Sequence, residues 1–281
     1  MDACPRPESG PTEVLSSHPA PGSALAKLWA LDRPWAIAHR GLSGLAPENT
    51  LAAVDMALDV GADMLEIDVS LTSDGHLVVL HDETLERTTS GAGAVRASSL
   101  QYVRSLDAGS WFEPRFGGEK VPVLSEVLER IRGRMAINVE IKAEAVDEEV
   151  RGGVAEKVVA ALHEAGMAGD ALVSSFEPRA LEQVRLVDSA LATGALYNRE
   201  IHRGVLPSTM TGAVGARTFH VNRWYLRWSQ LRDARAHGIP VLVYTVNRKW
   251  QMRALVHLGV RGLFTDRADW LMEVLGFDSS F

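Results

Sequence analysis

Carboxylate side chains interrupt two apolar segments of the sequence. Glu66 and Asp68 lie two residues apart in Met64–Val69, and Glu140 lies between apolar neighbours in Met135–Lys142. Residues two apart in a strand point to the same side, so Glu66 and Asp68 share one face. A buried parallel strand is normally apolar, and a buried carboxylate is normally paired or metal-bound. Three such carboxylates predict a site for one hard divalent cation, Mg²⁺ or Ca²⁺, since both prefer oxygen ligands.

Cationic side chains accompany these carboxylates and leave a second interpretation open. Lys142 lies two residues after Glu140, on the same side of the strand, and Arg40 follows another apolar run. A buried ion-pair network between these cations and the carboxylates would also satisfy the charges. The metal site is the interpretation that we favour.

Two histidines end neighbouring apolar runs. His39 closes Trp35–His39, and His81 closes His76–His81. Histidine is the side chain whose ordinary pKa suits proton transfer near neutral pH, and two of them on either side of a phosphorus centre would supply an acid and a base. Their convergence with three carboxylates favours catalysis over a structural role. The sequence does not distinguish which histidine is the acid.

Short apolar runs alternate with segments of helical period, which is typical of an α/β fold with a parallel sheet. The expected strands are Trp35–His39, Met64–Val69, His76–His81, Met135–Lys142, Ala171–Ser175, Leu191–Tyr197, Thr218–Asn222, Pro240–Val246 and Gly262–Thr265. The expected helices are Asn49–Val60, Leu124–Ile131, Asp147–Glu164, Pro178–Val187, Tyr225–His237 and Arg248–Leu258. Nine runs are one more than an eight-stranded barrel needs. The turn between the second and third runs is too short for a crossover helix, so one run need not belong to the barrel.

Two further segments set the domain boundaries. Residues 84–120, approximately, are polar and rich in Gly, Ser and Thr, and this length predicts a small inserted subdomain after the third strand. Residues 1–25 contain five prolines and scattered charges, so we expect a disordered lead-in before a barrel domain over residues 26–281.

Composition narrows the choice of partners. The formal net charge of −7 disfavours nucleic acid, so a phosphate substrate would need a bound cation or a few placed Arg and Lys side chains. A single cysteine, Cys4, excludes an intrachain disulfide and a cysteine-based zinc cluster. With no export signal and no apolar run of transmembrane length, we expect a cytoplasmic protein without stable membrane insertion. The oligomeric state cannot be predicted from the sequence.

An ordered set of motifs over Trp35–Trp270 resembles the glycerophosphodiester phosphodiesterase family, and most closely its cytoplasmic bacterial form. The motifs are His39-Arg40-Gly41, Pro47-Glu48-Asn49-Thr50, Glu66-Ile-Asp68, Thr72-Ser-Asp74-Gly75, His81-Asp82, Leu85-Glu-Arg87-Thr88-Thr89, Leu106 to Phe112, Val121-Pro122, Glu140-Ile-Lys142, Ser174-Ser175-Phe176, Tyr244-Thr-Val-Asn247, Gly259 to Gly262 and Thr265-Asp266. The mild departures are Tyr244, where many members have Trp, and Ala53-Val54, where many have an aromatic residue.

The resemblance implies a TIM (β/α)8 barrel with a small insertion after the second histidine. It also implies metal-dependent hydrolysis of glycerophosphodiesters, which are deacylated phospholipids, to sn-glycerol 3-phosphate and an alcohol. The implied roles are metal ligation by Glu66, Asp68 and Glu140, acid and base catalysis by His39 and His81, phosphate contacts from Arg40 and Lys142, and a place at or just behind the metal ligands for Glu48 and Asn49. The first nucleophile is either the glycerol 2-hydroxyl or water, and no residue predicts which alcohol is preferred.

Two other functions are compatible with parts of this pattern. Phospholipases similar to sphingomyelinase D share the barrel and the histidine pair, but they act on lipid surfaces, and this sequence shows no signal peptide and no apolar surface motif. A catalytically silent binding module could also use the barrel as a scaffold. The intact set of histidines and carboxylates argues against that function.

Overall fold

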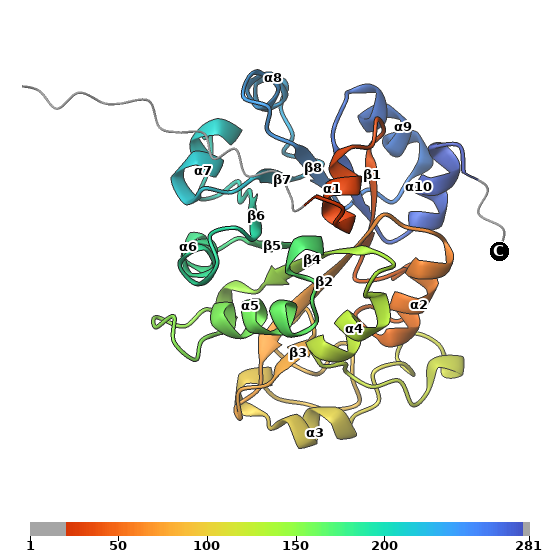
Figure 1. The fold of residues 1–281 in the computed structure, drawn as a ribbon. Helices are drawn as coiled ribbons and strands as arrows, with labels where there is room; N and C mark the ends of the chain where they lie inside the picture. The colour runs from red at the N-terminus through yellow and green to blue at the C-terminus, as the bar shows by residue number, and fades with distance from the viewer. Residues whose placement is uncertain (1–20, 278–281) are drawn as a thin grey trace, which may run out of the picture.

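The computed structural model describes residues 21–277, and within them a closed barrel of eight parallel strands carries one extra strand (Figure 1). The strands are β1 Trp35–His39, β2 Met64–Leu71, β3 Leu77–Val79, β4 Ala136–Ile141, β5 Ala171–Ser175, β6 Ala192–Leu196, β7 Thr218–Asn222, β8 Val241–Tyr244 and β9 Gly262–Thr265. Their order is β1-β9-β8-β7-β6-β5-β4-β2-β3, and the additional pairing of β1 with β2 closes the barrel. The predicted TIM barrel is confirmed.

Ten α-helices lie in the described part of the chain, most of them around the outside of the barrel. They are α1 Ala24–Trp29, α2 Leu51–Asp59, α3 Leu100–Ser105, α4 Leu124–Ile131, α5 Val154–Glu164, α6 Pro178–Val187, α7 Pro207–Val214, α8 Trp228–Ala236, α9 Lys249–His257 and α10 Ala268–Val274. None of the helices in residues 21–277 is long and apolar enough to cross a membrane.

The third predicted strand is not a barrel strand. β3 pairs with β2 in the antiparallel direction, with Val79 opposite Val69, because the tight turn between them reverses the chain without a crossover helix. The next barrel strand after β2 is therefore β4, which pairs directly with β2 in parallel. Just after β3, the backbone N–H of Leu80 donates to the carbonyl of Asp68 over 3.0 Å. This bond brings His81 back to the carboxyl end of β2.

Helix α1 was not predicted, and it forms the base of the barrel. Its Leu25 and Leu28 are buried and pack with Trp35, Ile37 and other side chains from the barrel interior. Ser23 caps the helix by accepting from the backbone N–H of Ala26. Residues 23–25, which the predicted lead-in included, therefore belong to the folded barrel, while residues 1–20 lie outside the described residues.

Replacing Leu28 with alanine should lower the free energy of unfolding by about 2 to 4 kcal/mol, because it leaves a cavity under the barrel. The predicted carboxylate and histidine site lies at the opposite ends of the strands, so the rate of the hydrolysis that the resemblance implies should stay within about twofold of the wild type at 25 °C. Urea unfolding together with a rate assay checks both statements. Equal stability of this variant and the wild type would show that α1 contributes little.

Helix α5 begins later than predicted. It starts at Val154, not at Asp147, since Asp147 accepts a hydrogen bond from Arg96 of the insertion and Gly152 has a φ of 73°. Asp147, Glu148 and Glu149, which the predicted helix included, therefore belong to the preceding loop.

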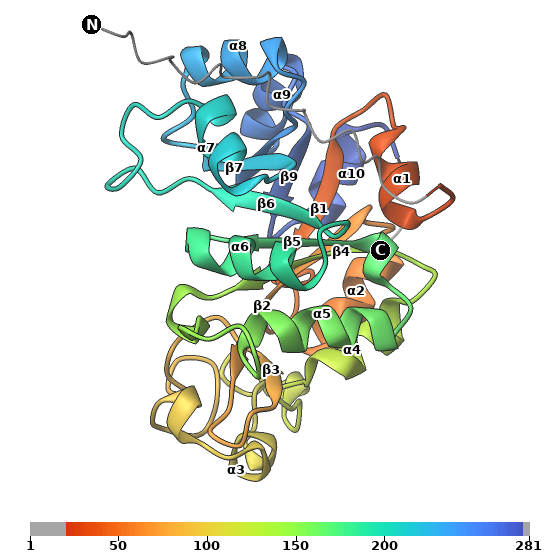
Figure 2. The same cartoon turned by 60° about the vertical axis from the view of Figure 1, so that its left-hand side comes forward.

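The insertion lies after β3 and has a small apolar core of its own (Figure 2). Its buried side chains are Leu80, Leu85, Val95, Val103, Leu106, Ala108 and Val121, with Val78 of β3. In Figure 2 it forms the lower left part of the molecule, while the loop between β6 and α7 extends to the left above it.

Candidate active site

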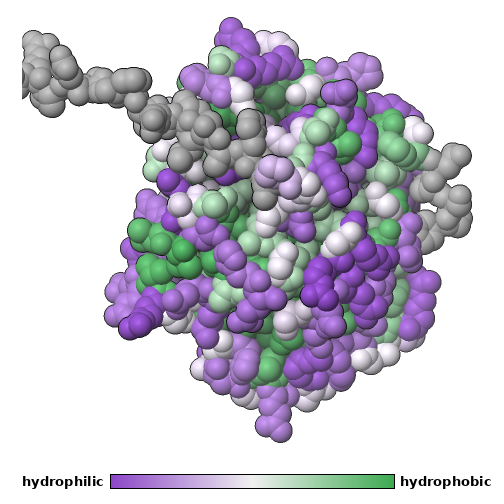
Figure 3. Space-filling view, in the orientation of Figure 1, coloured by the Kyte–Doolittle hydropathy of each residue, from purple (hydrophilic) through white to green (hydrophobic). Residues whose placement is uncertain are grey.

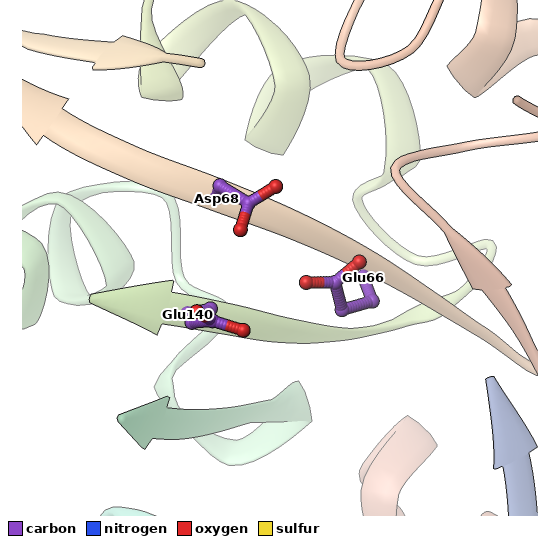
Figure 4. A group of neighbouring side chains, drawn as sticks. All are labelled: Glu66, Asp68 and Glu140. Atoms are coloured by element: carbon purple, nitrogen blue, oxygen red, sulfur yellow. The ribbon is translucent and has the colours of Figure 1, made fainter. Parts of the chain in front are cut away.

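The three predicted metal ligands converge at the carboxyl ends of β2 and β4 (Figure 4). Glu66, Asp68 and Glu140 each offer a carboxylate oxygen, and these oxygens lie within 4.8 Å of one another. Asp68 and Glu140 are opposite each other in the strand register, which explains the convergence. Their exposures of 2, 1 and 9% show that the protein largely removes them from water.

The turn after β1 contains two successive residues with a left-handed backbone conformation. Arg40 has a φ of 57°, and Gly41 follows with a φ of 81°. A Cβ atom at Gly41 would lie 2.6 Å from the backbone of Ala53 in α2, so only glycine fits this close approach. The left-handed conformation at Arg40 directs its backbone N–H to Glu66, over 2.9 Å.

Arg40 and Lys142 both contact Asp68. The Nε atom of Arg40 lies 3.1 Å from Asp68, and the Nζ atom of Lys142 lies 3.5 Å from it and 3.0 Å from Glu140. Asn49, whose φ is 58°, also donates to Asp68 over 3.0 Å. The ion pairs of the second interpretation therefore exist at Asp68 and Glu140, but within residues 21–277 none of them involves Glu66.

Glu66 differs from Asp68 in its surroundings. Burial and the neighbouring charge of Asp68 raise the pKa of Glu66 to about 8. Burial would also raise the pKa of Asp68, but Arg40 and Lys142 outweigh it and lower that pKa to about 2. Burial beside Asp68 raises the pKa of Glu140 as well. In the described residues, the one hydrogen-bond donor to Glu66 is the backbone of Arg40. The carboxylate oxygens of Glu66 are therefore incompletely neutralised and are available to bind a cation.

His39 is held by a carboxylate from the far end of the sequence. Its Nδ1 atom lies 2.6 Å from Asp266, which follows β9. Asp266 is itself fixed by donors from Ser43 and Asn247. Burial would lower the pKa of His39, but the hydrogen bond to Asp266 and the charge of Glu66 raise it overall. Sequence reasoning assigned no role to Asp266, although Thr265-Asp266 was among the motifs.

His81 has an equivalent partner next to it in the sequence. Its Nδ1 atom lies 2.6 Å from Asp82. Arg87 binds Asp82 and makes two hydrogen bonds to Glu48, over 2.9 and 2.8 Å, and Glu48 in turn accepts from Arg40 over 2.7 Å. Burial and the nearby cations lower the pKa of His81. Glu48 is therefore not one of the three clustered carboxylates, and it links Arg40, which follows β1, to Arg87 of the insertion.

Tyr244 occupies the position at which many family members have Trp. It packs edge-on against Phe176, with ring centroids 6.2 Å apart, and its hydroxyl donates to the carbonyl of Tyr197 over 3.3 Å. Tyr244, at the end of β8, therefore contacts Phe176, which follows β5, and Tyr197, which follows β6.

Comparisons with known proteins identify the family of the chain. The model of the glycerophosphoryl diester phosphodiesterase family matches residues 39–270. A Caldanaerobacter subterraneus glycerophosphodiester phosphodiesterase is 37% identical over 240 residues, covering 85% of this chain and 96% of that protein. A Bacillus subtilis protein of the same name is 34% identical and covers 93% of this chain and 94% of its own length.

Solved structures show the same fold. The structure of an Oleispira antarctica phosphodiesterase in complex with the product sn-glycerol-3-phosphate has a TM-score of 0.77 and 30% identity, over 90% of this chain and 99% of that one. An Agrobacterium tumefaciens glycerophosphodiester phosphodiesterase has a TM-score of 0.74 and 31% identity, over 84% of this chain and 98% of that one. The fold and the site define a TIM-barrel phosphodiester hydrolase. The chain belongs to the glycerophosphoryl diester phosphodiesterase family.

Proposed function

We propose that this enzyme hydrolyses glycerophosphodiesters to sn-glycerol 3-phosphate and an alcohol, with a divalent cation at Glu66, Asp68 and Glu140 and with His39 and His81 as acid and base. The observation that carries the proposal is the arrangement of two histidines, each held by its own carboxylate, around a buried cluster of three more. The product bound to the Oleispira antarctica relative supports the same chemistry.

The residues fit a hard divalent cation. All three ligands are carboxylates, their oxygens lie within 4.8 Å of one another, and the charge of Glu66 is the least compensated. A bound Mg²⁺ or Ca²⁺ would neutralise the phosphate oxygens and lower the pKa of a coordinated oxygen nucleophile. Neither ion is favoured over the other by this ligand set.

The histidines move the protons. With Nδ1 bonded to Asp266 or Asp82, each ring keeps Nε2 for the substrate. One histidine takes the proton of the attacking hydroxyl, which belongs to the glycerol 2-carbon or to water. Attack by the glycerol 2-hydroxyl gives a cyclic phosphate, and a water molecule must then open it to yield glycerol 3-phosphate. The other donates a proton to the alcohol oxygen as its bond to phosphorus breaks. Arg40 and Lys142 lie beside the carboxylates and contribute positive charge toward the phosphate.

Chelation of divalent cations is expected to abolish hydrolysis of glycerophosphocholine, and excess Mg²⁺ or Ca²⁺ is expected to restore it. Choline release and phosphorus NMR of the products measure the rate and the bond cleaved. Choline with glycerol 3-phosphate supports the proposal, whereas phosphocholine with glycerol contradicts it. Undiminished hydrolysis by thoroughly demetallated enzyme would exclude the metal.

A further inference from the structure

Exposed tryptophans gather at the carboxyl end of the barrel, away from the carboxylate cluster. Trp224 follows β7 directly, Trp228 begins α8, and Trp250 lies in the first turn of α9, with exposures of 67, 56 and 63%. The loop between β6 and α7 adds Ile201, which is 72% exposed. Large apolar side chains exposed together on one face mark an interaction site.

Arginines accompany these tryptophans. Residues 197–206, 223–227 and 245–249 contain six Arg or Lys and one acid, although the whole chain has a net charge of −7. Arg203, Arg227 and Arg248 are exposed, and none of the three forms an ion pair within the described residues. We call these three arginines with Trp224, Trp228 and Trp250 the Trp–Arg rim.

Contacts between the loops hold the rim in place. The Arg199 guanidinium lies over the ring of Tyr225 at 5.1 Å, which joins the loop after β6 to the loop after β7. Arg223 lies over Trp224 at 4.8 Å, and its backbone N–H donates to the carbonyl of Tyr244 over 2.8 Å. The rim is therefore part of the folded barrel.

The insertion, on the opposite side of the carboxyl end of the barrel, lacks this excess of positive charge. The insertion, over residues 84–120, contains five Arg or Lys and four acids, so its charges nearly balance. Its Trp111 is 40% exposed and donates its indole N–H to Ala108. The excess positive charge is thus confined to the loops after β6, β7 and β8.

We propose that the Trp–Arg rim docks this end of the barrel on the surface of an anionic phospholipid bilayer. Tryptophan has an apolar ring and a polar N–H, which suits it to the level of the lipid headgroups. Arginine is attracted to anionic headgroups. An aliphatic side chain such as Ile201 finds an apolar partner in a bilayer but not along a nucleic-acid backbone, so a membrane fits better than RNA.

The docked orientation has a consequence that rests on the proposed function. Glycerophosphodiesters form when both acyl chains are removed from a phospholipid, and that class of reaction takes place at a membrane. Docking through the carboxyl end would turn the active site toward the source of its substrate. The sequence alone indicated no apolar surface motif, because the rim is assembled from three separate loops.

Vesicle sedimentation tests the proposal without using hydrolysis as its readout. The wild type should sediment with vesicles of phosphatidylcholine and phosphatidylglycerol, and much less with phosphatidylcholine alone. The combined substitution Trp224→Ala, Trp228→Ala and Trp250→Ala should lower the partition coefficient by at least about tenfold, as should Arg203→Ala, Arg227→Ala and Arg248→Ala. Hydrolysis of soluble glycerophosphocholine should stay within about twofold, which shows that the variants fold.

Matched controls lie at the other end of the barrel. Arg132→Ala with Arg134→Ala removes exposed arginines before β4, and Leu186→Ala removes a 77% exposed side chain near the end of α6. In Figure 3 an apolar group lies over α6 at the left of the molecule. These controls should bind vesicles like the wild type. Equal loss in control and rim variants, or no wild-type binding, overturns the proposal. So does a rim-dependent dimer in the absence of vesicles, or rim-dependent binding to RNA in place of lipid.

Discussion

His39→Ala and His81→Ala are each expected to lower kcat by about 10² to 10⁴, while the double variant loses far less than the product of the two effects. The reason is that both rings act on one transition state, so removing either leaves the other without its complementary proton transfer. Steady-state kinetics on glycerophosphocholine at saturating Mg²⁺ measures the change. Wild-type turnover in either single variant would contradict the proposed pair.

Replacing a carboxylate that hydrogen-bonds one of these histidines tests whether the histidine acts in proton transfer. Asp266→Asn should lower kcat by about 100-fold or more, because an amide at this position can impose the wrong tautomer on His39. It also replaces the charged carboxylate, whose hydrogen bond and charge raise the pKa of His39, with a neutral amide, so one limb of the plot of kcat/KM against pH should move to lower pH. A structural role alone would lower activity without moving that limb.

A second His–Asp pair on the surface serves as the control. His163 lies 2.9 Å from Asp188 at an exposed position remote in sequence from the motifs. His163→Ala and Asp188→Asn should leave kcat within about twofold of the wild type. A large loss in these variants would mean that the assay reports folding rather than catalysis.

The local periodicity of strands explains why the carboxylates were predictable. Alternation in Glu66-Ile-Asp68 and in Glu140-Ile-Lys142 places the polar groups on one face, whatever the rest of the chain does. Parallel pairing of β2 with β4 then sets Asp68 opposite Glu140. The α/β class with a parallel sheet was predictable for a similar reason, since strands and helices alternate along nearly the whole chain, whereas the closed eight-stranded barrel was implied by the resemblance to the family.

The partner of His39 depends on tertiary structure and could not be predicted from spacing, whereas the partner of His81 is the next residue in the sequence. Asp266 is 227 positions from His39 and reaches it because closure of the barrel puts β9 beside β1. Arg87 reaches Glu48 only through the path of the insertion. His81 was predicted at the end of a parallel strand, and it reaches the site through an antiparallel one. The short helices α1, α3, α7 and α10 were missed, since their few residues give little periodic signal.

The last expected result concerns Glu66 and Asp68, whose replacement should have opposite effects on stability. Both Glu66→Gln and Asp68→Asn should lower kcat/KM by at least about 100-fold at a fixed Mg²⁺ concentration, because each removes a charged oxygen ligand. In the metal-free protein at pH 8, however, Glu66→Gln should raise the free energy of unfolding. Asp68→Asn should lower it by about 3 to 5 kcal/mol, because Arg40 and Lys142 lose their shared buried partner.

The dependence on pH follows from the two pKa shifts. The folded protein raises the pKa of Glu66 from 4.5 to about 8, so it holds a proton that the unfolded chain releases, and this contribution to stability falls as pH rises from about 4.5 to 8. Folding lowers the pKa of Asp68 from 3.8 to about 2. The stabilisation by the ionised Asp68 carboxylate is therefore present above pH 4 and is lost as pH falls toward 2.

Urea unfolding in chelator at pH 6 and pH 9 separates the metal site from the ion-pair network. The wild type should lose stability between these values, Glu66→Gln should lose less, and Mg²⁺ should stabilise the wild type but not the variant. The metal-site proposal requires Glu66 to be a charge without a partner until a cation binds. If Glu66→Gln destabilises the metal-free protein as much as Asp68→Asn, Glu66 belongs to a complete ion-pair network. The three buried carboxylates would then be neutralised by that network and not by a bound cation.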